Sequence, residues 1–510
     1  MKTALLLLAL ALPVMAATTL SPESPALSPD STSPAKEALD LFRSGRHTAA
    51  VEAAGPLAEK GNADALFLLG FASETGQGIE ASREKALDYY RRAAEAKHEE
   101  ATYRRALILL NSEKEEERKE GREALENAAK EDPGNAGRIL GEAWLRGSLS
   151  EKPDFDKGVE WWTRSADAGD TTSLILLARL YTGEFGFEDK TDAKKAIGFY
   201  QKAADLGDRN AWLPLGSRLL NGDEETRDEA KGREWIKKAT DDEQLIGWLA
   251  LGDFEENQKK DNKAAYAAYL KGADAGQPDC MLAVARFHYQ GLEGEKDEKK
   301  GRDWLEKAAT AGSGPAHLEL ARLLSGEEKP DTLKIYSHLV TAASTGIPAA
   351  QNELGLLYLS DRLGAADAPA AAAWFTRAAR SGFAASQNNL ATLYERGVGV
   401  EPNLQNAGEL YTLAANQGHP EATGALARLF ARGIGTTQNL TRAWALATLA
   451  LERGDEGARE VLGEISPNLT PELLVAAKKE LEEMKKPADQ KAEDKDKGEE
   501  AAEPAPAENP

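Results

Sequence analysis

A short segment that ends on glycine returns along this chain at a nearly constant interval. The endings TAASTG, AARSG, LAANQG and LALERG place glycines at positions 346, 382, 418 and 454, each 36 residues after the one before. Similar endings close at Gly169, Gly207, Gly276 and Gly312, at intervals that depart slightly from 36. Self-similarity at a period of about 20 to 50 residues is typical of stacked structural repeats. The spacing predicts about eleven repeats between residues 62 and 454.

Each repeat is predicted to hold two helices. In one first helix, Leu390, Ala391 and Tyr394 form an apolar stripe on one face, and Gly397 then provides the left-handed conformation that ends a helix. The second helices open on short polar residues that can accept hydrogen bonds from the first backbone N–H groups, namely Ser82, Asp192, Asp367 and Asn403. One helix pair cannot bury its own apolar face, so pairs must stack. The sequence therefore predicts an all-α fold, a right-handed α-solenoid (superhelix) of stacked antiparallel helix pairs.

The repeat resembles a known family. First helices follow A-x-x-x-L-G-x-x-Y, as in AAQNELGLLY (349–358), and second helices follow K-A-x-x-W-[YF]-x-[KR]-A-A-x-x-G, as in KAIGFYQKAADLG (195–207). This pattern resembles the Sel-like repeat (SLR) family, which is related to the tetratricopeptide repeats, over nearly four fifths of the chain. Repeats near residues 98–134 and 208–276 lack several signature residues. The resemblance implies a role in assembling envelope or signalling complexes.

The segments around the array have a different character. Residues 1–16 combine Lys2, an apolar run and a small-residue ending at Ala16, the pattern of a secretory signal peptide. We therefore expect export to the periplasm or the extracellular space, with no integral membrane anchor after cleavage. The other expected segments are a flexible Pro/Ser-rich linker (17–34), N-terminal capping helices (35–61), a C-terminal capping helix region (455–486) and a disordered acidic tail (487–510).

Composition argues against several classes of function. The net charge of −22 gives the chain no electrostatic reason to bind nucleic acid or anionic lipid. The single cysteine, Cys280, can form no internal disulfide. The histidines are scattered over different repeats without a close ligand pair: His47, His98, His288, His317, His338 and His419. The motif S-x-x-K at Ser82 lacks the further motifs of penicillin-recognising enzymes. The sequence therefore predicts no enzyme, no metal site and no cofactor.

Four arginines share one position in the repeat. Arg179, Arg286, Arg322 and Arg428 each follow the small residue of the first-helix pattern. In tetratricopeptide-type stacks this position tends to face the concave groove, so the resemblance implies a broken basic row there. One hypothesis is that these arginines bind carboxylates of an acidic peptide or of a chain terminus. The other is that each arginine pairs with Glu or Asp of an adjacent repeat.

Tryptophans divide into two groups. Those at the aromatic position of the second helix are predicted to be core residues: Trp161, Trp235, Trp304 and Trp374. Trp212 and Trp248 instead stand in first helices, where later repeats have Gln351 and Gln387. Packing between repeats is the simple explanation for Trp212 and Trp248. The alternative is an aromatic anchor for a partner, because Trp and Arg are enriched at binding hot spots.

We therefore expect a scaffold or adaptor that binds one or more proteins or peptides. The partner would lie in the concave groove of the solenoid, beside the four arginines. The alternative is a carbohydrate- or peptidoglycan-binding envelope protein, in which Trp212 and Trp248 would stack on sugar rings.

Overall fold

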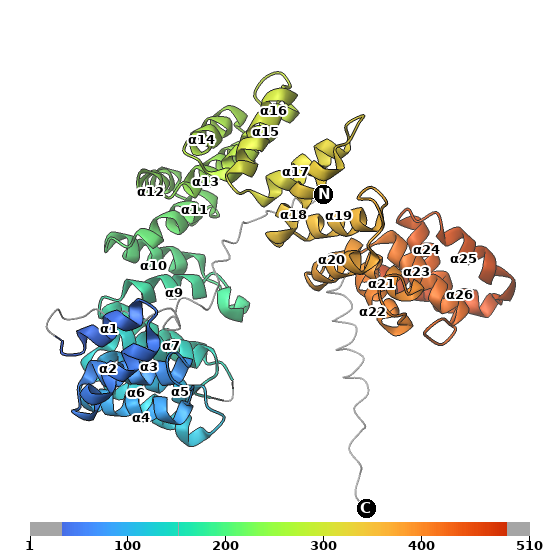
Figure 1. Ribbon diagram of the computed structural model, residues 1–510. Helices are drawn as coiled ribbons and strands as arrows, with labels where there is room; N and C mark the ends of the chain where they lie inside the picture. The colour runs from blue at the N-terminus through green and yellow to red at the C-terminus, as the bar shows by residue number, and fades with distance from the viewer. Residues whose placement is uncertain (1–32, 151, 487–510) are drawn as a thin grey trace, which may run out of the picture. The chain divides into compact units, whose positions relative to one another are not determined.

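The computed structural model describes residues 33–150 and 152–486. The predicted signal peptide, most of the predicted linker and the predicted acidic tail lie outside these residues. Within the described residues every regular element is a helix (Figure 1), which confirms the predicted all-α class. The chain divides into two compact units, Met1–Phe254 and Glu255–Pro510.

Unit 1 begins with α1 (Lys36–Arg43) and α2 (His47–Glu59). Five helix pairs follow: α3 (Ala63–Thr75) with α4 (Arg83–Glu95), α5 (Glu99–Leu110) with α6 (Glu115–Glu131), α7 (Pro133–Leu145) with α8 (Phe155–Asp167), α9 (Thr171–Leu180) with α10 (Ala193–Asp205), and α11 (Trp212–Asn221) with α12 (Glu229–Asp241). The unit ends with α13 (Ile246–Phe254) and contains three short 3-10 turns: η1 (Glu184–Gly186), η2 (Glu188–Lys190) and η3 (Arg209–Ala211).

Unit 2 begins with the π-helical turn η4 (Glu255–Lys259) and α14 (Asn262–Asp274). Its five pairs are α15 (Pro278–Gln290) with α16 (Glu298–Thr310), α17 (Gly314–Ser325) with α18 (Thr332–Ser344), α19 (Pro348–Leu359) with α20 (Ala368–Arg380), α21 (Ala384–Arg396) with α22 (Leu404–Asn416), and α23 (Pro420–Arg432) with α24 (Leu440–Glu452). The last elements are α25 (Ala458–Ile465), η5 (Ser466–Asn468) and α26 (Pro471–Lys485). In both units each second helix packs on its own first helix and on the first helix that follows, which confirms the stacked arrangement of a solenoid.

Local chemistry explains where the helices begin and end. The side chains of Ser82, Asp192, Asp367 and Asn403 accept hydrogen bonds from the backbone N–H three residues on, which confirms these residues as N-caps. Gly397 ends α21 with a φ of 66°, in the left-handed region where glycine is favoured.

The small residue of the first-helix pattern lies under a large ring of the second helix. A Cβ atom added at Gly70 would lie 2.7 Å from the ring of Tyr90, and one added at Gly355 would lie 2.6 Å from the ring of Phe375. Tyr90 and Phe375 are fully buried. The small residue therefore lets the two helices of a repeat approach closely enough to bury the aromatic ring between them.

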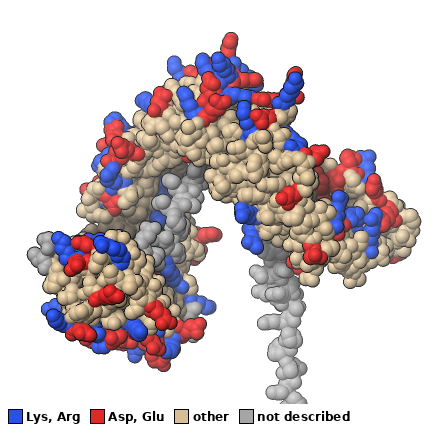
Figure 2. All heavy atoms as spheres, in the orientation of Figure 1, with Lys and Arg blue, Asp and Glu red and all other residues tan. Residues whose placement is uncertain are grey.

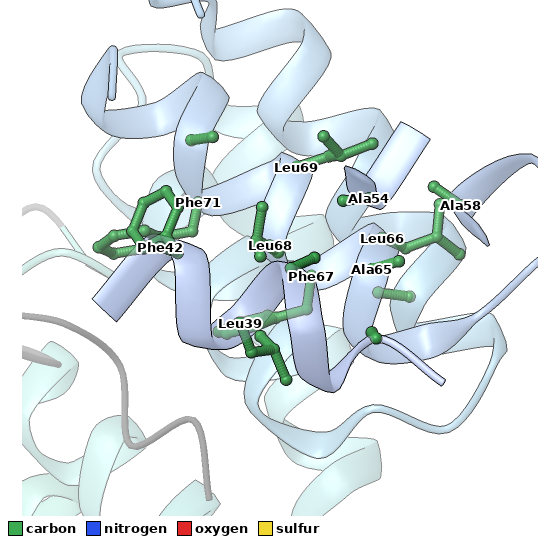
Figure 3. Packing of buried hydrophobic residues seen from close by; sticks show 14 of the residues in the cluster. Leu39, Phe42, Ala54, Ala58, Ala65, Leu66, Phe67, Leu68, Leu69 and Phe71 are labelled. Carbon is green, nitrogen blue, oxygen red and sulfur yellow. The ribbon is translucent and has the colours of Figure 1, made fainter. Parts of the chain in front are cut away.

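The core runs along the stack. Figure 3 shows its first part in unit 1, where side chains of α1, α2 and α3 interdigitate. The rings of Phe42 and Phe71 meet edge to face with their centroids 5.7 Å apart. At the other end of the chain α26 packs on α24, and Ala477 and Leu481 are its buried residues. Thr470 caps this helix.

Candidate functional site

One surface position recurs on the first helices. It is the residue directly after the small residue of the pattern, and we call this set the outer stripe. In unit 2 the outer stripe consists of Arg286, Arg322, Leu356, Thr392 and Arg428. All five are exposed or partly exposed, whereas the small residues directly before them are buried. Each repeat of unit 2 therefore presents one variable side chain of its first helix.

Two arginines of the outer stripe bind a carboxylate of the preceding repeat. Nη1 and Nη2 of Arg428 donate to Oε1 and Oε2 of Glu395 at 2.6 and 2.9 Å. Arg286 holds Glu256 in the same two-pronged way, at 2.7 and 2.5 Å. Such paired charge-assisted hydrogen bonds are among the stronger polar contacts in proteins. These contacts are the ion pairs between adjacent repeats that the second hypothesis for the arginines describes.

Tyrosines of the second helices complete these contacts. The hydroxyl of Tyr411 donates to Glu395 and that of Tyr269 donates to Glu256, both at 2.9 Å. Hydrogen bonds from Arg428 hold the pKa of Glu395 below its usual range, and burial raises the pKa of Tyr411 to about 12. We call this arrangement a Glu–Tyr–Arg contact. The one around Glu395 joins α21, α22 and α23, and the one around Glu256 joins η4, α14 and α15.

A related contact occurs in unit 1. Tyr90 donates to Glu74 at 2.6 Å, and Nη1 of Arg104 lies 3.6 Å from the same carboxylate. Arg104 stands on α5, the first helix of the following repeat. Glu, Tyr and Arg therefore meet between repeats in both units.

The other two arginines have different partners. Arg322 contacts Glu353 of the next repeat at 2.7 Å and Glu319 of its own helix at 2.9 Å. Arg179 lies in unit 1 and contacts Glu184, in the loop that follows its own helix, at 2.7 Å. All four candidate arginines are thus in ion pairs within the chain. Partner binding through them stays a prediction.

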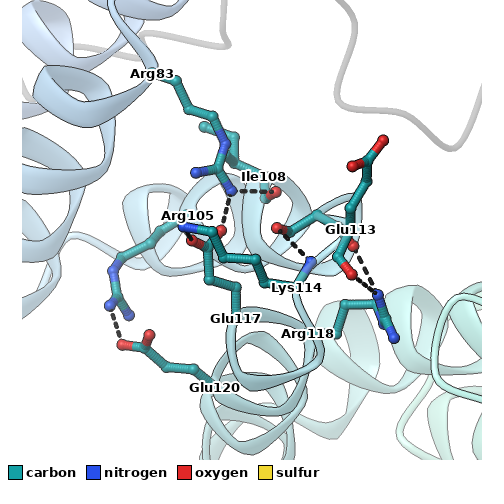
Figure 4. A network of polar contacts seen from close by, with 9 residues as sticks. Arg83, Arg105, Ile108, Glu113, Lys114, Glu117, Arg118 and Glu120 are labelled. Atoms are coloured by element: carbon teal, nitrogen blue, oxygen red, sulfur yellow. Dashed lines mark hydrogen bonds and ion pairs between the residues drawn. The ribbon is translucent and has the colours of Figure 1, made fainter.

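Ion pairs between helices are common elsewhere on the surface. Figure 4 shows a network in unit 1 in which Arg83 of α4 contacts Glu117 of α6, and Arg105 of α5 contacts Glu120 of α6. Figure 2 shows acidic and basic side chains intermixed around α15 and α16. Charged residues in these places chiefly neutralise one another.

The two candidate tryptophans differ in burial. Trp212 is 9% exposed and belongs to the core around α11, with Nζ of Lys238 4.4 Å above its ring. Trp248 on α13 is half-buried. For Trp212 the structure shows packing between helices, the simpler of the two explanations; a role in partner binding stays a prediction for both residues.

The prediction that four other tryptophans are core residues is wrong in detail. Trp161, Trp235, Trp304 and Trp374 are half-buried, and each ring lies under a cation three residues later on the same helix. The fully enclosed position is the next one, occupied by Trp162, Ile236, Leu305 and Phe375. One residue turns a helix by about 100°, which moves the first ring from the centre of the interface to its edge.

A second recurrent position lies inside the stack, four residues before the small residue. We call it the inner slot. Here Gln351 and Gln387 donate from Nε2 to the carbonyl oxygens of Ala343 and Ala379 at 3.2 and 3.3 Å. These amides satisfy carbonyls near the end of the preceding second helix, where no helical N–H follows.

The structure brings together two histidines that the sequence left scattered. His317 of α17 occupies the inner slot, and His338 of α18 occupies the aromatic position of the same repeat. Their Nδ1 atoms lie 2.8 Å apart. Superposing the repeats places these two positions side by side, whereas a search for short ligand motifs does not find them. Among the described residues no group of three or more His, Cys, Asp or Glu is placed to hold a metal ion.

Over the described part of the chain, none of the helices has both the length and the apolar character to cross a membrane.

The model of one protein family matches most of the repeats. The Sel1 repeat model matches residues 63–98, 139–170, 172–208, 215–242, 278–313, 348–383, 384–419 and 420–455, together more than half of the chain. Helix pairs α5–α6 and α17–α18, and helices α13 and α14, lie outside the matched segments. They keep the helical pattern while losing signature residues.

Known proteins share the repeat at low identity. The chain is 26% identical over 271 residues to "Chitin synthase regulator SKT5" of Saccharomyces cerevisiae, covering 50% of this chain and 38% of the yeast protein. It is 28% identical over 256 residues to "Chitin synthase regulatory factor 3" of Schizosaccharomyces pombe, covering 47% of this chain and 27% of that protein. The chain therefore matches well under half the length of these curated relatives.

A solved structure supports the fold. The crystal structure of c5321, a protective antigen present in uropathogenic Escherichia coli strains and displaying an SLR fold, is 25% identical with a TM-score of 0.50. The match covers 90% of this chain and 99% of that one. Repeat pattern, stacked helix pairs and family model agree: the chain belongs to the Sel1 repeat family.

Proposed function

We propose that this Sel1 repeat protein is an exported scaffold that holds a protein partner along the first helices of its repeats. A stack of repeats offers an extended surface without a catalytic centre, which suits the binding of another protein. The names of the two yeast relatives, both regulators of chitin synthase, support action through another protein. Residues 1–16, with the features of a signal peptide, support export.

The observation that carries the proposal is the outer stripe of unit 2. It changes from arginine to leucine to threonine and back to arginine over consecutive repeats, while the residue directly before it stays small and buried. Leu356 is 46% exposed, and it stands at the position where α15, α17 and α23 carry arginines. A large apolar side chain on a surface position suits an anchor for a partner.

Two matched variants test the binding surface. Leu356→Arg changes the outer stripe, and Leu413→Arg changes an equally exposed leucine, 51% exposed, on the second helix α22. Both variants should fold, because other repeats carry Arg at each of these positions, Arg322 and Arg377. The untagged chain would be immobilised and exposed to an envelope extract, and bound proteins identified by mass spectrometry.

We expect a protein that is retained by the wild type and by Leu413→Arg and is lost from Leu356→Arg. Loss of the bound protein from Leu413→Arg but not from Leu356→Arg would place the binding surface on the second helices and overturn the proposal. Retention of purified cell-wall glycan in place of any protein would favour the sugar-binding alternative. A sugar ring needs an exposed aromatic face, which the buried Trp212 does not offer; the half-buried Trp248 is the other residue on which that alternative depends.

Export has its own test. Residues 1–34 would be fused to alkaline phosphatase, which becomes active only where disulfides form, outside the bacterial cytoplasm. Activity that disappears when an arginine is placed in the apolar run at Leu8 would support export. Equal activity from both fusions would contradict it.

A further inference from the structure

The contact between His317 and His338 is the starting point. Their rings come from the two helices of one repeat, α17 and α18, with centroids 5.0 Å apart and planes inclined by 44°. Both side chains are partly buried. The remaining described histidines, His47, His98, His288 and His419, stand apart from this pair.

Nδ1 of His317 faces Nδ1 of His338, and the backbone of Ala309 acts on the ring of His317 from another side. Ala309 stands where Ala343 and Ala379 accept hydrogen bonds from Gln351 and Gln387. In the tautomer that carries its proton on Nε2, His317 presents a lone pair on Nδ1 to the second ring. Histidines that bind metals typically use this arrangement, with the other ring N–H directed to a carbonyl.

We propose that His317 and His338 form a binding site for a divalent copper ion, with their Nδ1 atoms as two adjacent ligands. Metal–imidazole bonds are about 2.0 Å long, so ligand atoms 2.8 Å apart subtend about 90° at the ion. That angle suits the square-planar or tetragonal geometry of copper(II) better than the wider angle of tetrahedral zinc. Imidazole is a good copper ligand, and copper(II) binds most strongly among the divalent first-row ions.

Protons and charge can be accommodated. Neutral rings are the form that binds metal, and burial lowers the pKa of both histidines. When His317 carries its proton on Nε2, the proton between the two rings belongs to Nδ1 of His338 in the copper-free pair. On copper binding Nδ1 of His338 loses this proton and Nε2 of the same ring takes one up, so the ring stays neutral. Glu306 of α16 is close enough to interact electrostatically with His338 and would favour a cation. Water would fill the other coordination positions, because the described residues offer no third protein ligand.

Neighbouring repeats supply the variants for a test. His317→Gln installs the amide that Gln351 and Gln387 use in the same slot to bond the equivalent carbonyls, so the slot is filled by a residue that fits it while the metal ligand is lost. His338→Trp installs the residue that stands in this position on α16 and α20, Trp304 and Trp374. His288→Gln serves as the control, because it removes a partly buried histidine that lies outside the pair.

The untagged full chain would be titrated with copper(II) against glycine as a competing chelator and examined by electron paramagnetic resonance. We expect one copper per chain, with hyperfine structure from two nitrogens, in the wild type and in His288→Gln. Affinity should fall at least about tenfold in His317→Gln and His338→Trp, with unchanged helical circular dichroism. Undiminished binding in these two variants, or no bound copper in the wild type, would overturn the proposal whether or not the chain is a scaffold.

Discussion

At the scale of single residues, the Glu–Tyr–Arg contacts decide what the arginines of the outer stripe do in the free protein. Glu395 is 13% exposed and Arg428 30% exposed, whereas Arg322 and its partner Glu353 are 45% and 30% exposed. Exposed ion pairs contribute little to stability, but a mostly buried carboxylate that loses its partner is costly. The two arginines should therefore respond differently to the same substitution.

We expect Arg428→Glu to lower the free energy of unfolding by about 2 kcal/mol, because it leaves Glu395 buried beside a second carboxylate. Arg322→Glu should cost less than about 1 kcal/mol. Urea unfolding of the full chain followed by circular dichroism would measure both values. Equal midpoints for Arg428→Glu and the wild type would show that the contact does not hold the repeats together.

His98 gives unit 1 a dependence on pH. Its Nδ1 accepts a hydrogen bond from the backbone N–H of Ala101 at 3.3 Å and so caps α5, while its ring stacks on Phe67. Burial lowers the pKa of His98, against the opposing influence of Asp64 and Glu99. The unfolded chain, with a histidine pKa of about 6.5, therefore takes up a proton before the folded chain does. This contribution to stability is complete above about pH 6.5 and is lost as the pH falls through the lower folded pKa.

His98→Asn should remove this pH dependence, because asparagine caps without titrating, as Asn62 does for α3. Melting temperatures of the full chain at pH 7.5 and 5.5 would be compared. The wild type should lose more stability than the variant between these values. The same loss in both proteins would exclude His98 as the source.

At the scale of elements, helix pairs and caps could be predicted because they depend on local chemistry repeated many times. The choice between two adjacent aromatic positions could not be predicted. Trp161 and Trp162 are both apolar, and only the packing between helices, with Gly141 of α7 under the ring of Trp162 and leucines of α9 beside it, decides that Trp162 is enclosed. The His317–His338 pair was missed for a related reason: each residue replaces a different signature residue, and their contact exists only between helices.

The loop that follows each second helix offers a prediction at this scale. The repeat glycine adopts a positive φ, for example 81° at Gly382, but Lys97 and Glu243 take its place with a φ of 64° each. A left-handed conformation costs a residue with a Cβ atom about 1 to 2 kcal/mol, partly offset because glycine gains freedom in the unfolded chain. Lys97→Gly and Glu243→Gly should therefore each stabilise the protein by about 0.5 to 1 kcal/mol.

Gly382→Ala provides the opposite control, since nothing lies within 4 Å of an added Cβ atom and only the backbone conformation opposes it. It should destabilise the chain in the same urea titration. A neutral effect of all three substitutions would mean that the loops relax without cost.

At the scale of the whole molecule, the ends of a repeat array need covering, because each repeat relies on its neighbours to bury its apolar face. In unit 2, α26 covers α24: Leu481 packs with Ala445 and Leu449, and Lys485 contacts Glu452 at 2.9 Å.

Removing residues 471–510 should expose this surface, lower the free energy of unfolding by at least about 2 kcal/mol and promote association. Removing only residues 487–510 serves as the control and should leave the melting curve unchanged. Hydrogen exchange would show which helices lose stability. Faster exchange of α23 and α24 in the longer truncation supports a capping role for α26. Equal protection in both truncations contradicts it.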